Sequence, residues 1–220
     1  MNKVLKFAFL DFRLLKPYLK SLLTVPLIGI VMGIVSKSAM SMSVYFLTGL
    51  LLVISYPFTI SEKNGLDMLY STLPLDRKTV VRGRYLFVLI LGISGIPASL
   101  LFSALLSGAS GEKFILGETA AMLLLMAGLL SAAAALQYPI YFKYGYTKGR
   151  FPALIPLLVI FLGFIAAPNI AVLLNYDLDW ERVFAAVNIK FLCALAMPAG
   201  TAALGLSCML SGRIYSKKDL

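Results

Sequence analysis

A charged segment that runs from Glu62 to Tyr85, between two strongly apolar runs, contains the side chains best spaced for a specific task. Four of its apolar residues recur at i, i+3, i+4 and i+7 and therefore share one helix face: Leu66, Leu69, Tyr70 and Leu73. Gly65 separates this helix from the preceding run, and Pro74 ends it because proline disfavours helical geometry at the residue before it. A helix this short is unstable alone in water, so its apolar face must dock. Docking in a groove of another protein and folding back onto this chain or the lipid surface are both open.

Acidic residues mark the starts of two helices in this segment. Asp67 stands near the start of the first, where a carboxylate can accept hydrogen bonds from backbone N–H groups and meets the positive end of the helix dipole. Asp76 is expected to cap a second helix, which continues through Lys78 and Arg82 into the next apolar run. The segment is therefore suited to binding the surface of another element or molecule.

Residue patterns for catalysis are missing from the sequence. The chain has no His, no H-E-x-x-H, no G-x-S-x-G elbow and no Gly-Lys dipeptide, which removes the usual zinc, serine-hydrolase and P-loop sites. Cys193 and Cys208 fall in one apolar run and are expected to be inert packing residues, not a metal site or a disulfide. We expect a non-catalytic chain without a cofactor, which must receive energy from another chain if it performs work.

The composition identifies an integral membrane protein. Of the 220 residues, 60% are hydrophobic and 14% are charged, whereas soluble domains have about 45–50% apolar and about 25% charged residues. Apolar runs near the length needed to cross a bilayer predict six transmembrane helices over residues 22–35, 42–60, 85–106, 118–142, 151–174 and 188–210. The expected fold is an all-α membrane protein with residues 1–220 in a single transmembrane domain. Ser36 and Ser38 resemble a signal-peptidase site, but Lys37 interrupts it and no cleavage is expected.

The distribution of Lys and Arg predicts the orientation. Five lie in residues 1–20, five in the loop 61–84, three in the loop 143–150 and three in the tail 211–220, against four on the other side. Because positively charged loops stay inside, both termini are expected in the cytoplasm. The net charge of +10 is explained first by these cytoplasmic loops, and binding of an acidic ligand is the second explanation. No nucleic-acid partner is expected.

A basic amphipathic helix is expected over residues 1–20, lying on the inner membrane surface. Its cations share one sector of the helix: Lys3, Lys6, Arg13, Lys16 and Lys20. Asp11 projects from the apolar side, where it could pair with a neighbouring helix or mark a bend. The helix contributes to topology, and it could also act as a lever joined to the first span.

The middles of the predicted spans contain no charged side chain. Ion-coupled carriers and channels usually place ionisable or ring-forming polar groups at membrane depth. An ion-coupled carrier is therefore the less favoured class, and an apolar interior suits a hydrophobic or amphipathic cargo.

The segment after the second span resembles that of ABC-2-type transporter permeases. The matching residues are Glu62-Lys63-Asn64-Gly65, the Leu-rich turn, Leu73-Pro74-Leu75-Asp76-Arg77-Lys78 and the Tyr that enters span 3, Tyr85. Six spans, the N-terminal helix and the lack of a nucleotide site are also similar, so the resemblance covers the whole chain. Ser61 departs from the pattern, since many relatives have a second acidic residue there. Among subgroups the chain looks most like small bacterial exporters of amphipathic peptides, such as the phenol-soluble modulin exporters.

The resemblance implies partners and a mechanism. Two permease subunits, identical or different, would each sit on a separate cytoplasmic ABC ATPase that binds ATP and Mg, in a bacterial cell membrane. The 62–74 helix would be a cytoplasmic coupling helix in a cleft of the ATPase, with these contact residues: Glu62, Lys63, Gly65, Leu66, Asp67, Leu69, Tyr70, Leu73, Pro74 and Arg77. A second cytoplasmic contact would consist of Lys143, Tyr144, Tyr146, Lys148 and Arg150. Alternating access driven by the ATPase would then export an amphipathic or hydrophobic cargo, with a peptide as the expected class. The alternative from another class is a non-transporting membrane anchor or sensor that recruits a cytoplasmic protein through the same helix.

Overall fold

The computed structural model describes residues 3–18, 20, 24, 27–28, 31, 34–35, 49–50, 53–66, 69–70, 76–110, 115–173 and 189–217. Throughout these residues the regular elements are helices, and none is a strand. They are α1 (Lys3–Leu15), the 3-10 turn η1 (Lys16–Tyr18), α5 (Tyr56–Lys63), α7 (Arg77–Ser110), α8 (Leu116–Leu173) and α10 (Ile189–Ser216). The expected all-α fold is confirmed for this part of the chain.

Three stretches of the described residues are long and apolar enough to cross a membrane: Arg77–Leu105, Thr119–Ile155 and Leu195–Ser216. They overlap the predicted spans 85–106, 118–142 and 188–210. Residues 151–173, predicted as the fifth span, are helical as the far part of α8. The span predicted over residues 22–35 lies largely outside the described residues and the one over 42–60 lies partly outside them, so six spans are not confirmed.

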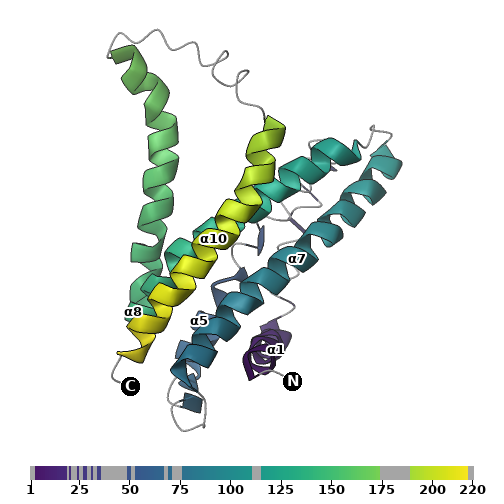
Figure 1. The fold of residues 1–220 in the computed structure, drawn as a ribbon. Coiled ribbons are helices and arrows are strands. Elements are labelled where there is room, and N and C mark those ends of the chain that lie inside the picture. Colours follow the sequence, from purple (N-terminus) through teal and green to yellow (C-terminus); the bar gives the residue numbers. More distant parts are fainter. Residues whose placement is uncertain are drawn as a thin grey trace.

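The long helices α7, α8 and α10 share one end with the short elements (Figure 1). The end of α10, the start of α7, and α1 and α5 lie together there, and the far part of α8 leads away beyond a bend. That the two termini share a side of the membrane stays a prediction.

The near part of α8 packs against α10 at two glycines. A Cβ atom added to Gly128 would lie 2.4 Å from the carbonyl oxygen of Ala196, and one added to Gly200 would lie 2.5 Å from the carbonyl oxygen of Gly128. Small residues let the backbones of membrane helices approach closely and so increase their van der Waals contact. Gly200 lies in the predicted sixth span, and its packing here lies within one subunit.

Hydroxyl groups link the three long helices in their interior. Ser207 of α10 donates to the carbonyl oxygen of Ala135 in α8 (2.6 Å), so it accepts from the hydroxyl of Tyr85 in α7 (2.6 Å). Ser211 lies 2.8 Å from the same tyrosine hydroxyl and can donate to it. These hydrogen bonds satisfy buried polar groups and fix the relative positions of the helices.

Helix α1 uses its apolar face to pack on α7. Phe7, Ala8, Asp11 and Leu15 are buried, and a Cβ atom at Gly83 of α7 would lie 2.6 Å from a ring carbon of Phe7. The five predicted cations are all exposed, which confirms the amphipathic division of the helix.

One predicted helix start is confirmed, and one predicted loop is wrong. Within the segment 61–84, α7 begins at Arg77, directly after the expected cap Asp76. The loop 143–150 does not exist as a loop, since α8 is helical on both sides of the single non-helical residue Gly145. Polar composition suggested a loop there, but exposed polar residues are equally compatible with a helix.

Candidate functional site

The C-terminus of α5 places Glu62 at the centre of the site. The amide N–H of Asn64 bonds to the carbonyl of Ile60 (3.0 Å), and that of Gly65 bonds to the carbonyl of Glu62 (3.3 Å). Gly65 has a φ of 62°, a left-handed conformation that ends the helix and that glycine adopts without steric cost. The chain thereby turns toward the segment that begins at Leu66, as the sequence predicts.

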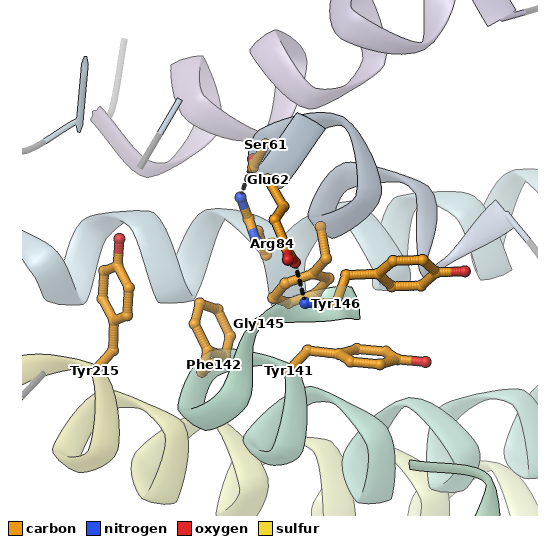
Figure 2. A pocket seen from close by; sticks show the side chains of 9 residues that line it. Ser61, Glu62, Arg84, Tyr141, Phe142, Gly145, Tyr146 and Tyr215 are labelled. Carbon is orange, nitrogen blue, oxygen red and sulfur yellow. Dashed lines mark hydrogen bonds between the residues drawn. The ribbon is translucent and has the colours of Figure 1, made fainter. Parts of the chain in front are cut away.

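Glu62 caps the far part of α8 from outside that helix. One of its carboxylate oxygens accepts hydrogen bonds from the backbone N–H groups of Tyr146 (2.5 Å) and Thr147 (2.9 Å). These amides open the helix after the break at Gly145, where no intrahelical acceptor is available to them. The negative charge also meets the positive end of the helix dipole. Figure 2 shows the Glu62 side chain reaching this backbone.

Gly145 makes this contact possible. Its backbone has φ 77° and ψ 177°, a region that is essentially restricted to glycine. A Cβ atom there would also lie 3.0 Å from the Glu62 oxygen that accepts both bonds. Glycine is therefore required by the backbone conformation, and its missing Cβ also leaves room for the carboxylate of Glu62.

Arg84 of α7 is buried beside the same junction and joins three helices. Its guanidinium donates a hydrogen bond to the hydroxyl of Ser61 in α5. It lies 4.2 Å from the ring centroid of Phe58 in α5 and 5.7 Å from that of Phe142 in α8 (Figure 2). Cation–π contacts and one hydrogen bond thus stabilise the buried guanidinium of Arg84.

Asp11 of α1 supplies the negative charge on this side of the bundle. It is fully buried, and neither carboxylate oxygen has a hydrogen-bond partner among the described residues. Burial raises the pKa of the Asp11 carboxyl from 3.8 to about 6, and the positive charge of Arg84 opposes part of this rise. Asp11 therefore forms no direct pair with a neighbouring helix among the described residues, and the charge of Arg84 acts on it only at a distance.

Aromatic side chains fill the space between α5 and α8. The ring of Phe58 lies 4.8 Å from that of Tyr138, 5.2 Å from that of Tyr141 and 5.0 Å from that of Phe142. The Tyr138 hydroxyl donates to the carbonyl of Ile54, just before α5 (2.8 Å). The remaining cavity has a volume of about 10 Å³, room for no more than a water molecule. The junction is a packed joint between helices, without space for a ligand.

A family model described as ABC-2 family transporter protein matches residues 8–216. The chain belongs to the ABC-2 transporter family. Neither the curated proteins nor the solved structures contain a match to it. Membership makes the chain a multi-pass membrane subunit of an ABC transporter, and it implies a partner ABC ATPase.

The predicted coupling segment of this ABC-2 permease is divided between interior and surface. Tyr70 is buried, with its ring 5.1 Å from that of Phe7 in α1, and Leu66 is half-buried. Leu69 is 53% exposed. Part of the apolar stripe therefore folds back onto α1, which is one of the two alternatives, and Leu69 faces outward. Docking of Leu69 on another protein stays a prediction. Asp67, Leu73 and Pro74 lie outside the described residues.

The second predicted contact of the permease is mainly exposed. Lys143, Tyr144, Lys148 and Arg150 are on the surface, and Tyr146 turns inward, with its ring 5.6 Å from that of Tyr141. The structure brings this group next to Glu62 and Lys63, since Glu62 binds its backbone. Two groups of residues that are far apart in the sequence therefore form one site.

Arg77 has an internal role in addition to the predicted one. Its guanidinium donates to the carbonyls of Tyr215 (3.4 Å) and Ser216 (3.2 Å) at the end of α10. A cation at a helix C-terminus satisfies carbonyls that lack intrahelical partners. It links the start of α7 to the end of α10.

Sequence reasoning missed Phe58, Arg84, Phe142 and Phe7 as members of the site. Arg84 was assigned to a loop, although it is a buried residue of α7. The available signal was Asp11 on the apolar face of its helix, because a buried carboxylate indicates a neighbouring cation.

Proposed function

We propose that the chain is the permease subunit of an ATP-driven exporter, and that the joint at Glu62 transmits the movement of the ATPase to the spans. The observation that carries this proposal is the pair of hydrogen bonds from Tyr146 and Thr147 to the Glu62 carboxylate. They connect the predicted coupling segment to the start of the far part of α8. A load applied to one contact region therefore reaches the other.

The packing around Glu62 supports a joint that passes on the movement of α5, and not one that bends and absorbs it. Helix α5 and the residues just before it are held to α8 by the hydrogen bond from Tyr138 to Ile54 and by the ring contacts of Phe58. The hydrogen bond from Arg84 to Ser61 holds α5 to α7. Such a packed joint moves as a unit, because interiors at this density change between discrete arrangements. Displacement of α5 would then change the bend at Gly145 and tilt the far part of α8.

The surface next to this joint suits a cytoplasmic ATPase. Lys63, Lys143, Lys148 and Arg150 are exposed, as is the apolar side chain of Leu69. An apolar anchor surrounded by cations is typical of a helix that docks in a groove with an acidic rim. ATP and Mg would be bound by that partner.

The cargo class follows from the helix interiors and from the resemblance to peptide exporters. Ser99, Ser103 and Ser107 in α7 and Ser131 in α8 donate their hydroxyl hydrogens to carbonyls of their own helices. Because these hydroxyls are paired within their own helices, they add little polarity to the helix surfaces, which fits an amphipathic or hydrophobic peptide as cargo. Apolar side chains exposed along α7 and α10, such as Leu101, Leu105 and Leu206, would face lipid or a second permease.

The test uses a tagged chain purified from membranes together with the P-loop ATPase that it binds, reconstituted in vesicles. Leu69→Asp with Leu73→Asp is expected to abolish ATPase binding, because charges replace the anchor. At a saturating concentration of the ATPase, Glu62→Gln is expected to reduce cargo-stimulated ATP hydrolysis by about 5- to 30-fold, as for the loss of roughly 1–2 kcal/mol of helix capping.

The outcomes separate the alternatives. Normal binding and stimulation in the double Asp variant would refute docking through this segment. ATPase binding without any response to amphipathic peptides would favour a membrane anchor or sensor. Cargo movement driven by an ion gradient without ATP would indicate an ion-coupled carrier.

A further inference from the structure

A hollow of about 390 Å³ lies between the start of α7 and the end of α10, away from the Glu62 joint. Lys78 and Arg82 of α7 and Arg213 of α10 line it, with Val81 and Met209 as apolar lining and Gly212 at its wall. The lining contains three cations and no acidic side chain.

The three cations are exposed, and their side chains form no hydrogen bond or ion pair with the residues that the structure describes. Lys78 and Arg82 stand four residues apart on one helix face, a spacing at which like charges repel. An anion in the hollow would relieve this repulsion, and guanidinium groups bind phosphate through two parallel hydrogen bonds.

The hollow lies at the membrane boundary. The apolar stretch of α7 begins at Arg77, and that of α10 ends at Ser216. Along α10, Ala202, Leu206, Met209 and Arg213 fall within one sector of the helix, and all four are exposed. Leu206 and Met209 are each 71% exposed. Arg213 thus stands at the polar end of an apolar stripe that points toward the membrane interior.

We infer that this hollow binds the phosphate of an anionic phospholipid, with an acyl chain along Leu206 and Met209. Basic pockets between membrane helices are suited to anionic head groups. The apolar stripe favours a lipid over free phosphate, which would use the three cations alone. The inference does not depend on transport or on the ATPase.

The chain offers a block that leaves the charges in place. A Cβ atom at Gly212 would meet nothing within 4 Å, so Gly212→Leu should fold normally while filling the hollow. Gly205 of α10 has equally free space around it, so Gly205→Leu is the matched control outside the lining.

The experiment measures lipid retained by the purified full-length chain in nanodiscs of phosphatidylcholine with or without about one fifth phosphatidylglycerol. Native mass spectrometry should show selective retention of phosphatidylglycerol by the wild type and by Gly205→Leu. Gly212→Leu should lose it. Since each basic side chain contributes up to about fivefold, Lys78→Gln with Arg82→Gln and Arg213→Gln should weaken retention up to about 100-fold at low salt. Lys3→Gln with Lys16→Gln and Lys20→Gln controls for overall charge.

Equal retention by the wild type and Gly212→Leu would overturn the inference. So would an equal loss in the two triple variants, which would show attraction by net charge alone. Inorganic phosphate forms a separate arm: if it raises the Tm of the lipid-free chain as much as phosphatidylglycerol does, the site binds free phosphate and the lipid assignment is wrong.

Discussion

At the residue scale, Glu62 and Gly145 act as a pair. A carboxylate can cap a helix from another element only where the backbone amides are free and no side chain intervenes. Gly145 provides both conditions, through its φ of 77° and its missing Cβ. Both residues are polar or small and exposed or half-exposed, so burial alone would not have revealed their connection.

Replacing Gly145 by Ala should destabilise the protein by roughly 1–3 kcal/mol, because alanine is strained at this backbone conformation and its Cβ would crowd Glu62. A thermal unfolding scan of the purified chain measures the effect as a lower Tm. Gly205→Ala, within α10 and with free space for a Cβ, should instead be neutral or stabilising. Equal Tm values for the two variants would contradict the strain argument.

Asp11 should make stability depend on pH. Its pKa is raised from 3.8 to about 6, so the folded chain binds this proton more tightly than the unfolded chain does. Stability should therefore fall as pH rises from about 4 to about 6 and change little above that range. Asp11→Asn, which cannot ionise, should remove this component. The check is the difference in Tm between wild type and variant from pH 4 to 8; parallel curves would show that Asp11 does not titrate in the fold.

At the element scale, α8 differs most from expectation. Residues 118–142 and 151–174 were predicted as spans joined by a loop, whereas one glycine forms the whole connection. Hydropathy shows where apolar runs end, but it does not distinguish a loop from a polar stretch of helix. The predicted start of the helix after Asp76 was right, because a cap and a proline give local signals.

The contact between α8 and α10 should be sensitive to one methyl group. Gly128→Ala would place a Cβ 2.4 Å from a backbone oxygen of α10, which cannot rotate away. The helices must separate, at a cost of about 1–3 kcal/mol. Thermal unfolding of the purified chain should show this, and Gly92→Ala is the control, since its Cβ would make an ordinary 3.8 Å contact with Leu130. Similar losses for both variants would mean that glycine content, not close approach, matters.

At the scale of the whole molecule, the ends of α10 and α1 and the bend of α8 share one side of the bundle, and the start of α8 lies at the other (Figure 1). The charge distribution predicts that the shared side is cytoplasmic. The shared end is known from the packing of the helices, and its cytoplasmic side is predicted from the distribution of charge, so the two rest on independent information.

Cysteine labelling tests this orientation. In a background with Cys193→Ala and Cys208→Ala, Gly117→Cys should react with a membrane-impermeant maleimide in intact cells. Lys143→Cys and Lys217→Cys, both at exposed positions, should react only after permeabilisation. Labelling of Lys143→Cys and Lys217→Cys on opposite sides would contradict the shared end, and labelling of both in intact cells would reverse the orientation.

The sequence by itself determined the class of the protein, the absence of a catalytic motif and the two segments on which the site is built. These follow from composition and from local spacing, such as the stripe from Leu66 to Tyr70 and the cap at Asp76. Only the tertiary structure decided that Glu62 binds the backbone at Tyr146, that Tyr70 turns toward Phe7 and that Arg84 is buried. The reason is physical. Periodicity shows which face of a helix is apolar, whereas a contact with a residue of another helix depends on how the two helices pack, which no local sequence pattern specifies.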